Sequence, residues 1–219
     1  MKKYLEILRK CSLFDDISNK NLIPMLGCLN AEVITFKKGE TVFHEGEPAK
    51  NVGIVLAGAL QIIKNDFYGN RNIITNIEPS RLFGEAFACA DVKELPVTVV
   101  ASENSEIMMI DCRRITSTCC NSCEFHNQII FNLLKILAVK NIQFNMKAEV
   151  TSMRTTREKL LAYLMQRAKI CNSNTFTIPF NRQELADYLQ VDRSGLSVEI
   201  SKLKKECIIE SNKNKFRLL

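Results

Sequence analysis

The chain has 219 residues, of which 46% are hydrophobic and 25% are charged, so it can bury a sizeable core and is not a disordered protein. No apolar run reaches the roughly 18 residues of a transmembrane helix, and the N-terminus reads as a short amphipathic helix rather than a signal peptide, so we expect a cytoplasmic protein. The formal net charge of +6 is uneven, because residues 1–150 carry 17 basic and 17 acidic side chains whereas residues 151–219 carry 13 basic and 7 acidic ones. This asymmetry predicts a polyanionic partner for the C-terminal segment, either nucleic acid or an acidic membrane surface.

The first part of the chain changes from a helical to a strand pattern. Apolar residues recur at helical intervals over residues 4–29, with Pro24 and Gly27 as expected breaks. Short alternating runs follow, with turn signals between them, at 31–36, 41–43, 54–56, 60–63, 72–77, 97–101 and 107–110. Several short strands of this kind predict a barrel or a sandwich.

A long helix is predicted over residues 124–150. One set of residues follows a heptad spacing: Ile129, Asn132, Ile136, Val139, Gln143, Met146 and Val150. A second apolar stripe runs beside it, made of Ile130, Leu133, Leu137 and Phe144. One stripe could cover the strand domain while the other pairs with a second copy of the chain, which makes this a candidate dimerisation helix. The alternative is a helix that is wholly buried in its own core.

Residues 181–205 predict two short helices joined by a tight turn. Asn181 is an N-cap with Glu184 as its capping-box partner, and Asp192 is the N-cap of the second helix. Between the two helices lies the turn Gln190–Asp192, and a further helix (155–168) and a short edge strand (176–180) precede them. Two helices so joined form a helix-turn-helix, whose second helix enters the DNA major groove. Residues 208–218 read as a hairpin beside it, so nucleic acid replaces a membrane as the expected partner.

The ordered segments of the chain resemble the Crp–Fnr family of bacterial transcription regulators. The resemblance is carried by Phe36–Pro48, Gly53–Ile62, Leu82–Ala88 and the DNA-reading unit at 181–203, and it covers essentially the whole chain. It implies an α+β fold with three parts. These are an N-terminal antiparallel β-roll (a double-stranded β-helix, jelly-roll-like) sensor domain at 1–123, a dimerisation helix at 124–150 and a C-terminal winged helix-turn-helix at 151–219. It also implies a homodimer that binds a roughly palindromic double-stranded DNA site and contacts RNA polymerase.

The candidate DNA contacts lie on the two helices and the hairpin. They are Arg182, Gln183, Arg193, Ser194, Ser197, Ser201, Lys202, Lys213, Lys215 and Arg217. Arg193 is expected at a guanine or a phosphate, and Ser194 and Ser197 at groove contacts. Arg182, Gln183, Lys202 and the hairpin cations are expected at phosphates. Family members often have Gly where Gln190 stands, so we expect a positive φ there. They often have Glu and Arg where Ser194 and Val198 stand, so the DNA site of familiar members is not carried over.

The candidate effector pocket is made of Gly84, Glu85, Leu95 and Pro96. Relatives that bind cyclic nucleotides carry an Arg-Ser pair, or a similar one, at the positions of Leu95 and Pro96. Leucine cannot neutralise a buried phosphate, and proline lacks a backbone N–H, so the resemblance argues against a cyclic nucleotide as effector. Glu85 then serves either the fold or another small molecule.

A group of cysteines offers a second route to sensing. Cys112, Cys119, Cys120 and Cys123 lie within twelve residues, close enough in sequence to hold a metal or an Fe–S cluster, or to form a redox disulfide. Iron–sulfur members of the family use an N-terminal cysteine group, which Cys11 and Cys28 do not reproduce. The alternative is that these are small, semi-buried side chains, as nine reduced cysteines in a cytosolic protein can be.

An enzyme and a non-DNA-binding sensor or adaptor are the two alternatives to DNA binding. An enzyme on the strand domain would need clustered histidines and carboxylates, but His44 and His126 are the only histidines, and they fall in different elements. A lone histidine is usually a surface or core residue, so neither histidine indicates haem. No phosphate-loop or nucleophile-elbow motif occurs, and we therefore expect no enzyme. A sensor or adaptor that has lost DNA reading stays open because of Gln190 and Val198.

Overall fold

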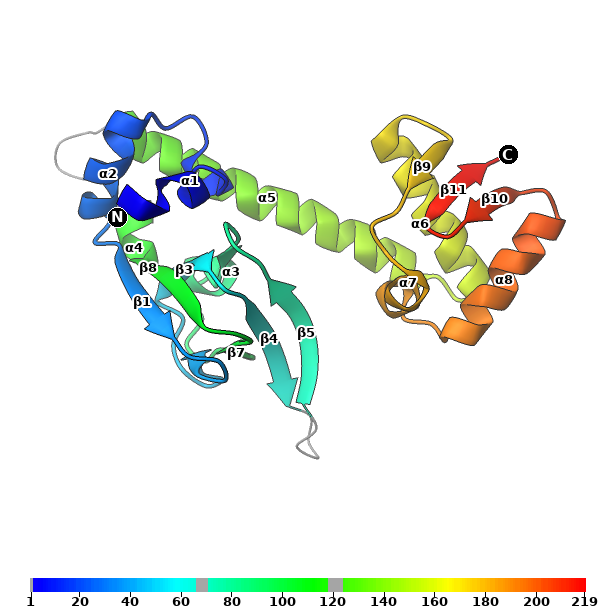
Figure 1. Cartoon of the computed structure of the whole chain (residues 1–219), viewed down its shortest axis with the longest axis horizontal. Coiled ribbons are helices and arrows are strands. Elements are labelled where there is room, and N and C mark those ends of the chain that lie inside the picture. Colours follow the sequence, from blue (N-terminus) through cyan, green and yellow to red (C-terminus); the bar gives the residue numbers. More distant parts are fainter. Residues whose placement is uncertain (1, 66–70, 118–123) are drawn as a thin grey trace. The chain divides into compact units, whose positions relative to one another are not determined.

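The computed structural model describes residues 2–65, 71–117 and 124–219 (Figure 1). It divides into two compact units, Met1–Val139 and Lys140–Leu219, and each has its own core. The division falls inside the long helix α5 (Glu124–Ser152), whereas the predicted domain boundaries lie at residues 123 and 150. Within the described residues, no helix has the length and apolar character needed to cross a membrane.

Two antiparallel sheets of four strands form the N-terminal unit. The first has the order β1 (Glu32–Phe36), β8 (Ser105–Asp111), β3 (Asn51–Ala57) and β6 (Leu82–Phe83). The second has the order β2 (Thr41–Phe43), β7 (Thr98–Ala101), β4 (Leu60–Asn65) and β5 (Arg71–Ile77). The predicted antiparallel β-roll is confirmed. Strand β6 was not predicted, because two residues are too few to show a period.

Strand β3 is buried on both faces, and this explains its unbroken apolar sequence. Val52 and Ile54 pack with the helices on the outer side, while Val55 packs with strands of both sheets on the inner side. Gly53 stands between Val52 and Ile54 in the sequence and lies against the ring of Phe83, where a Cβ would fall 2.2 Å from a ring carbon. Glycine at this position therefore lets the two strands of the pair approach each other.

Short helices cover the outer side of the first sheet. They are α1 (Leu5–Leu8), α2 (Asn19–Cys28), α3 (Glu85–Cys89) and α4 (Cys112–Thr116), with 3₁₀ turns at Lys2–Tyr4 and Ser12–Phe14. Helix α2 continues through Pro24 and Gly27, so the breaks predicted there are wrong. Proline removes one backbone donor, but burial of Met25 and Leu26 in the core holds the helix together.

The first turns of α5 belong to the core of the N-terminal unit. Ile129 and Asn132 are buried, and the Asn132 amide donates to the backbone oxygens of Leu13 at 3.0 Å and Asp15 at 2.8 Å. Of the two stripes that the sequence shows on this helix, the heptad set therefore packs on its own unit at these two positions, which are not available to a second chain. The helix instead exposes Phe131 and, one turn further on, Leu134.

The C-terminal unit is a helix-turn-helix with a three-stranded antiparallel sheet. Its helices are α6 (Thr156–Cys171), α7 (Arg182–Leu189) and α8 (Arg193–Lys205), and its sheet has the order β10 (Ile209–Asn212), β11 (Lys215–Leu218) and β9 (Thr175–Thr177). Strand β9 ends before Ile178, so it is shorter than predicted. The side chains of Leu164, Leu185, Leu196 and Phe216 meet in one core, which confirms the predicted winged helix-turn-helix.

Candidate nucleic-acid interface

Helix α7 begins with a complete capping box. The Asn181 side-chain oxygen accepts from the Glu184 backbone N–H at 3.0 Å, and the Glu184 carboxylate accepts from the Asn181 N–H at 2.7 Å. Two backbone donors that the helix leaves free are thereby satisfied. The start of α7 that the sequence predicts is confirmed.

The turn between α7 and α8 is fixed by three consecutive residues. Gln190 adopts the left-handed conformation, with φ 53° and ψ 54°, as predicted from the glycine common at this position. Val191 packs against the core, and the Asp192 carboxylate accepts from the Gly195 backbone N–H at 2.8 Å. Hydrogen bonds from the Ser194 hydroxyl and this N–H hold the pKa of Asp192 below its ordinary value. The turn therefore sets where the first residues of α8 lie.

Helix α8 has one buried face and one exposed polar face. Leu196, Ile200 and Leu203 are buried, as predicted. On the exposed side, the Ser197 hydroxyl donates to the Arg193 carbonyl and the Ser201 hydroxyl to the Ser197 carbonyl, each at 3.0 Å. Each hydroxyl oxygen keeps its capacity to accept a hydrogen bond, so the exposed face is a row of short polar groups.

A polar groove lies between the exposed face of α8 and the β10–β11 hairpin. Its volume is about 330 Å³, and its lining residues are Arg182, Ser197, Ile200, Ser201, Lys204, Ser211, Asn212 and Lys213. We call it the α8–wing groove. It brings together four of the predicted DNA contacts: Arg182, Ser197, Ser201 and Lys213. The sequence reasoning missed Lys204, although it stands three residues after Ser201 and thus on the same helix face.

Arg182 is anchored to the hairpin. Its guanidinium lies over the Phe216 ring at 5.7 Å and donates to the Lys213 carbonyl at 3.4 Å. The side chain is half-buried, and this desolvation lowers the pKa of Arg182 from its ordinary value. The contacts hold a positive charge at the point where α7 begins beside the hairpin turn.

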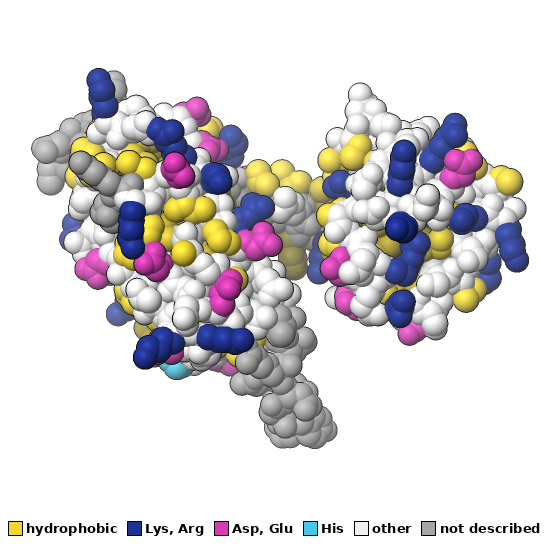
Figure 2. Space-filling view, in the orientation of Figure 1, with side chains coloured by type: hydrophobic (Ala, Val, Ile, Leu, Met, Phe, Trp, Pro, Cys, Tyr) yellow, Lys and Arg dark blue, Asp and Glu magenta, His cyan; other side chains and the backbone are white. Residues whose placement is uncertain are grey.

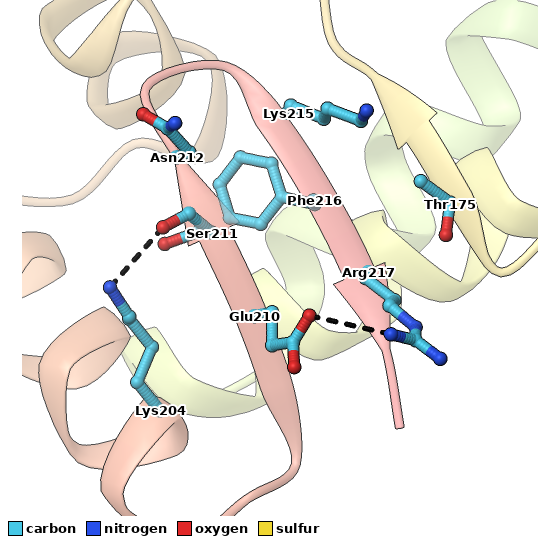
Figure 3. A pocket seen from close by; sticks show the side chains of 8 residues that line it. All are labelled: Thr175, Lys204, Glu210, Ser211, Asn212, Lys215, Phe216 and Arg217. Atoms are coloured by element: carbon cyan, nitrogen blue, oxygen red, sulfur yellow. Dashed lines mark hydrogen bonds and ion pairs between the residues drawn. The ribbon is translucent and has the colours of Figure 1, made fainter.

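The cations on and beside the hairpin differ in the contacts that they make (Figure 3). Lys204 reaches from α8 to the Ser211 carbonyl at 3.2 Å, which ties the helix to β10. Arg217 forms an ion pair with Glu210 at 3.6 Å on the neighbouring strand, which offsets part of its charge. Lys215 is exposed on β11 and lines a separate, shallow hollow together with Lys204, Glu210 and Arg217.

Other predicted contacts lie outside the α8–wing groove. Ser194 and Lys202 line a second hollow with Arg157 of α6, and Lys202 is paired with Glu199 at 2.7 Å. Gln183 donates to Asp187 on α7 at 2.9 Å. Arg193 is exposed in the first turn of α8, beside the turn that Asp192 caps.

The exposed face of α8 also carries an apolar side chain. Val198 is 53% exposed, one helical turn after Ser194. Valine cannot donate or accept a hydrogen bond, so its place in a DNA groove would be against an apolar group such as the thymine methyl. Figure 2 shows Lys and Arg side chains spread over the visible face of the C-terminal unit, with few acidic ones among them.

The predicted effector residues flank the connection between β2 and β3. Gly84 has φ 78°, and a Cβ there would fall 2.8 Å from the Phe43 ring. Glu85 follows it and is buried. Leu95 is buried and exchanges backbone hydrogen bonds with Gly46 and Glu47 (2.9 and 2.8 Å), while Pro96 is exposed.

The predicted metal or redox residues fall largely beyond the described part of the chain. Cys119, Cys120 and Cys123 lie outside the described residues, and Cys112 is buried at the start of α4. Among the residues that are described, no group of three or more His, Cys, Asp or Glu side chains could hold a metal ion. His44 is exposed, and His126 is buried with its Nε2 lacking a hydrogen-bond partner within the described ranges.

Comparisons with known proteins agree with this geometry. Residues 33–119 match the family model of the cyclic nucleotide-binding domain, and residues 158–219 match that of the Crp-like helix-turn-helix domain. The transcriptional activator protein FnrA of Stutzerimonas stutzeri is 24% identical over 188 residues, 84% of this chain and 75% of FnrA. The potassium channel KOR2 of Oryza sativa subsp. japonica is 25% identical over 158 residues, 72% of this chain but 22% of the channel.

The fold matches solved structures of regulators. The catabolite activator protein of Thermus thermophilus has a TM-score of 0.56 and 17% identity, covering 95% of this chain and 93% of that one. The two matched segments lie in the two units of the chain and together cover more than half of it. With its β-roll and its winged helix-turn-helix, the chain belongs to the Crp–Fnr family of DNA-binding transcription regulators.

Proposed function

We propose that the chain is a homodimeric regulator that binds a specific, roughly palindromic DNA site and is controlled by a signal sensed in the β-roll. In this proposal each copy places α8 in one major groove, and the hairpin meets the adjacent phosphates. By analogy with relatives that are named transcriptional activators, we also propose that it acts in the cytoplasm on RNA polymerase, without an enzymatic activity of its own.

The observation that carries the proposal is the α8–wing groove. Three cations, Arg182, Lys204 and Lys213, stand around the hydroxyls of Ser197 and Ser201. Cations at a groove edge neutralise phosphates, while short hydroxyls on the adjoining helix can approach base edges. A groove built in this way suits a double-stranded DNA backbone better than a small neutral ligand.

Base reading is assigned to the first turns of α8. Arg193 has the donors for the two acceptors of a guanine, and Ser194 and Ser197 are short enough to sit close to a base edge. Exposed Val198 supports an apolar contact with a thymine methyl. The combination supports a DNA site different from that of relatives with Glu and Arg on this helix.

A homodimer is supported by an exposed apolar stripe on α5. Phe131 and Leu134 are each 60% exposed and Ile142 is 58% exposed. With Ala138 between them, they follow one another at intervals of three, four and four residues, which keeps all four on one face of the helix. We define these four residues as the α5 stripe and propose that it pairs with the same stripe of a second copy about a two-fold axis.

The nature of the signal follows from Leu95 and Pro96. A cyclic phosphate buried at this place needs a cation or N–H donors, but Leu95 presents an apolar side chain and Pro96 has no N–H. We therefore propose that the effector is another small molecule or a redox signal. A metal, an Fe–S cluster or haem stays open as the sensing group, although no ligand pattern of the family points to one, and Cys119, Cys120 and Cys123 lie outside the described residues.

The test is DNA binding by matched charge variants. Arg193→Ala is expected to weaken specific binding by roughly 10-fold or more and to relax the preference at one base pair. Lys169→Ala removes an exposed cation from α6, away from the α8–wing groove, and should leave specificity unchanged. If neither the wild type nor either variant prefers any sequence, the alternative holds, namely a sensor or adaptor that has lost DNA reading.

A further inference from the structure

Two cysteines that lie far apart in the sequence meet in the N-terminal unit. The sulfur atoms of Cys89 and Cys112 are 3.4 Å apart, within reach of a thiol–thiol hydrogen bond, and both thiols are free. Cys89 is the last residue of α3, and Cys112 is the first residue of α4. Cys112 also belongs to the cysteine group that the sequence singles out, but its contact with Cys89 lies wholly within the described residues.

The two thiols have unequal access to solvent. Cys89 is exposed, whereas Cys112 belongs to the hydrophobic core together with Ala88 and Ile110. Burial, followed by the hydrogen bond with Cys89, raises the pKa of the Cys112 thiol to about 12. An oxidant in solution therefore meets Cys89 first, and Cys112 stands directly behind it.

The surrounding contacts keep the two helix ends together. Asp111 caps α4 by accepting from the Arg113 backbone N–H at 2.9 Å, and the Arg113 guanidinium lies 3.8 Å from the Asp91 carboxylate just beyond α3. A disulfide bond is about 2.05 Å long, so the two sulfurs need to approach each other by about 1.4 Å to bond.

We propose that Cys89 and Cys112 form a reversible redox pair, in which a peroxide oxidises Cys89 and Cys112 then closes the disulfide. This inference rests on the thiol geometry alone and does not depend on the proposed DNA binding. It gives the β-roll an oxidative input at the end of the helix that starts after Gly84, so the disulfide ties the predicted effector segment to the end of β8.

The chemistry balances with hydrogen peroxide as the oxidant. The Cys89 sulfur attacks one peroxide oxygen, the O–O bond breaks, and a sulfenic acid and one water form. The Cys112 sulfur then attacks the Cys89 sulfur, the S–O bond breaks, and the departing hydroxide takes the Cys112 proton as a second water. Two thiols lose two electrons in total, and one peroxide is reduced. Dithiothreitol reverses the step, because it reduces the disulfide to two thiols and is itself oxidised to a cyclic disulfide.

The test uses the full chain, reduced and then treated with hydrogen peroxide. Remaining thiols are blocked with N-ethylmaleimide, and the protein is digested with trypsin. Cleavage after Arg81, Lys93 and Arg113 releases peptides 82–93 and 94–113, each with one cysteine of the pair. We expect these peptides to be joined in the oxidised sample, lighter than their sum by two hydrogen atoms, and to separate after dithiothreitol.

Matched variants keep the proposal falsifiable. Cys89→Ser is an exposed change and should abolish the joined peptide, whereas Cys28→Ser removes another exposed cysteine and should leave it unchanged. Cys112→Ala should leave a sulfenic acid at Cys89 that dimedone traps. The proposal is overturned if both peptides are recovered separately blocked after full oxidation, or if Cys89 joins any cysteine other than Cys112.

Discussion

Gln190 carries the backbone conformation on which the helix-turn-helix depends. Its φ of 53° lies in the left-handed region, where glycine has no steric penalty and other residues do. The backbone N–H groups of Gln190 and Val191 still donate to α7, at 3.1 and 3.0 Å from the carbonyls of Asp187 and Ala186. The strain is therefore local to one side chain, and the fold tolerates it.

Replacing this residue tests that account. Gln190→Gly should raise the free energy of unfolding of the C-terminal unit by about 0.5–1 kcal/mol, because it removes the left-handed penalty without touching a contact of the core. Denaturant unfolding of the full chain measures the change. Gln190→Val is the opposite control and should destabilise, because a β-branched side chain tolerates positive φ poorly. Equal stability of the Gly and Val variants would contradict the account.

Asp192 makes the capping of α8 dependent on pH. Its pKa is lowered in the folded protein by the hydrogen bonds from the Ser194 hydroxyl and the Gly195 N–H. A group with a lowered pKa contributes stability above its unfolded pKa of about 3.9, and the contribution is lost as pH falls through the folded pKa. Wild type should therefore lose more stability than Asp192→Asn as the pH falls from about 5 to about 2. Melting curves over this range measure the difference, and parallel curves would count against the cap.

At the scale of single elements, α5 shows that a heptad pattern can mark the face of a helix that packs on its own unit. The heptad that the sequence predicts includes Asn132, which lies in the core of the chain because its amide meets two backbone oxygens from the segment after α1. Hydrophobic spacing alone cannot distinguish a stripe that packs on its own unit from one that meets a partner. The α5 stripe emerges only when the exposed fractions of Phe131 and Leu134 are known.

The two registers predict different dimer variants. Leu134→Glu should convert the dimer to a monomer at micromolar concentration, because it puts a charge in the centre of the α5 stripe. Gln143→Glu adds the same charge at an exposed position of the heptad set and should leave the dimer intact. Sedimentation velocity distinguishes them. Dissociation by Gln143→Glu and not by Leu134→Glu would place the interface on the heptad set instead.

Local sequence signals predicted the reading unit better than the sensor. The capping box at Asn181 and the cap at Asp192 act within three residues, so a single sequence reveals them. The contact between Cys89 and Cys112 joins residues brought together only by the packing of α3 and α4, and no spacing rule points to it. Lys204 could be predicted in part. Helical spacing places it on the same face as Ser201, but the groove is completed by the hairpin, which is a separate element.

At the scale of the whole molecule, the charge asymmetry has a structural location. The excess of basic residues lies in the segment that forms the helix-turn-helix and its hairpin, and Arg182, Lys204 and Lys213 surround one groove there. Each phosphate that a protein neutralises releases counterions, so affinity falls with salt in proportion to the number of contacts.

Salt dependence therefore counts these contacts. Lys204→Ala should weaken binding to all DNA sequences alike and reduce the slope of log affinity against log salt by about 1 for each protomer. Lys169→Ala, on α6, should leave the slope unchanged. Fluorescence anisotropy over a series of salt concentrations gives both slopes. A Lys204 variant with the slope of wild type would remove this residue from the interface.

The most direct test of the central claim is selection of binding sites from random double-stranded DNA, followed by footprinting of the selected site at several salt concentrations. The account predicts a two-fold symmetric site whose half-sites are centred about one helical turn, roughly 34 Å, apart, with affinity that falls steeply as salt rises. Recovery of no preferred sequence, or of a preferred site without two-fold symmetry whose binding is insensitive to salt, would contradict it.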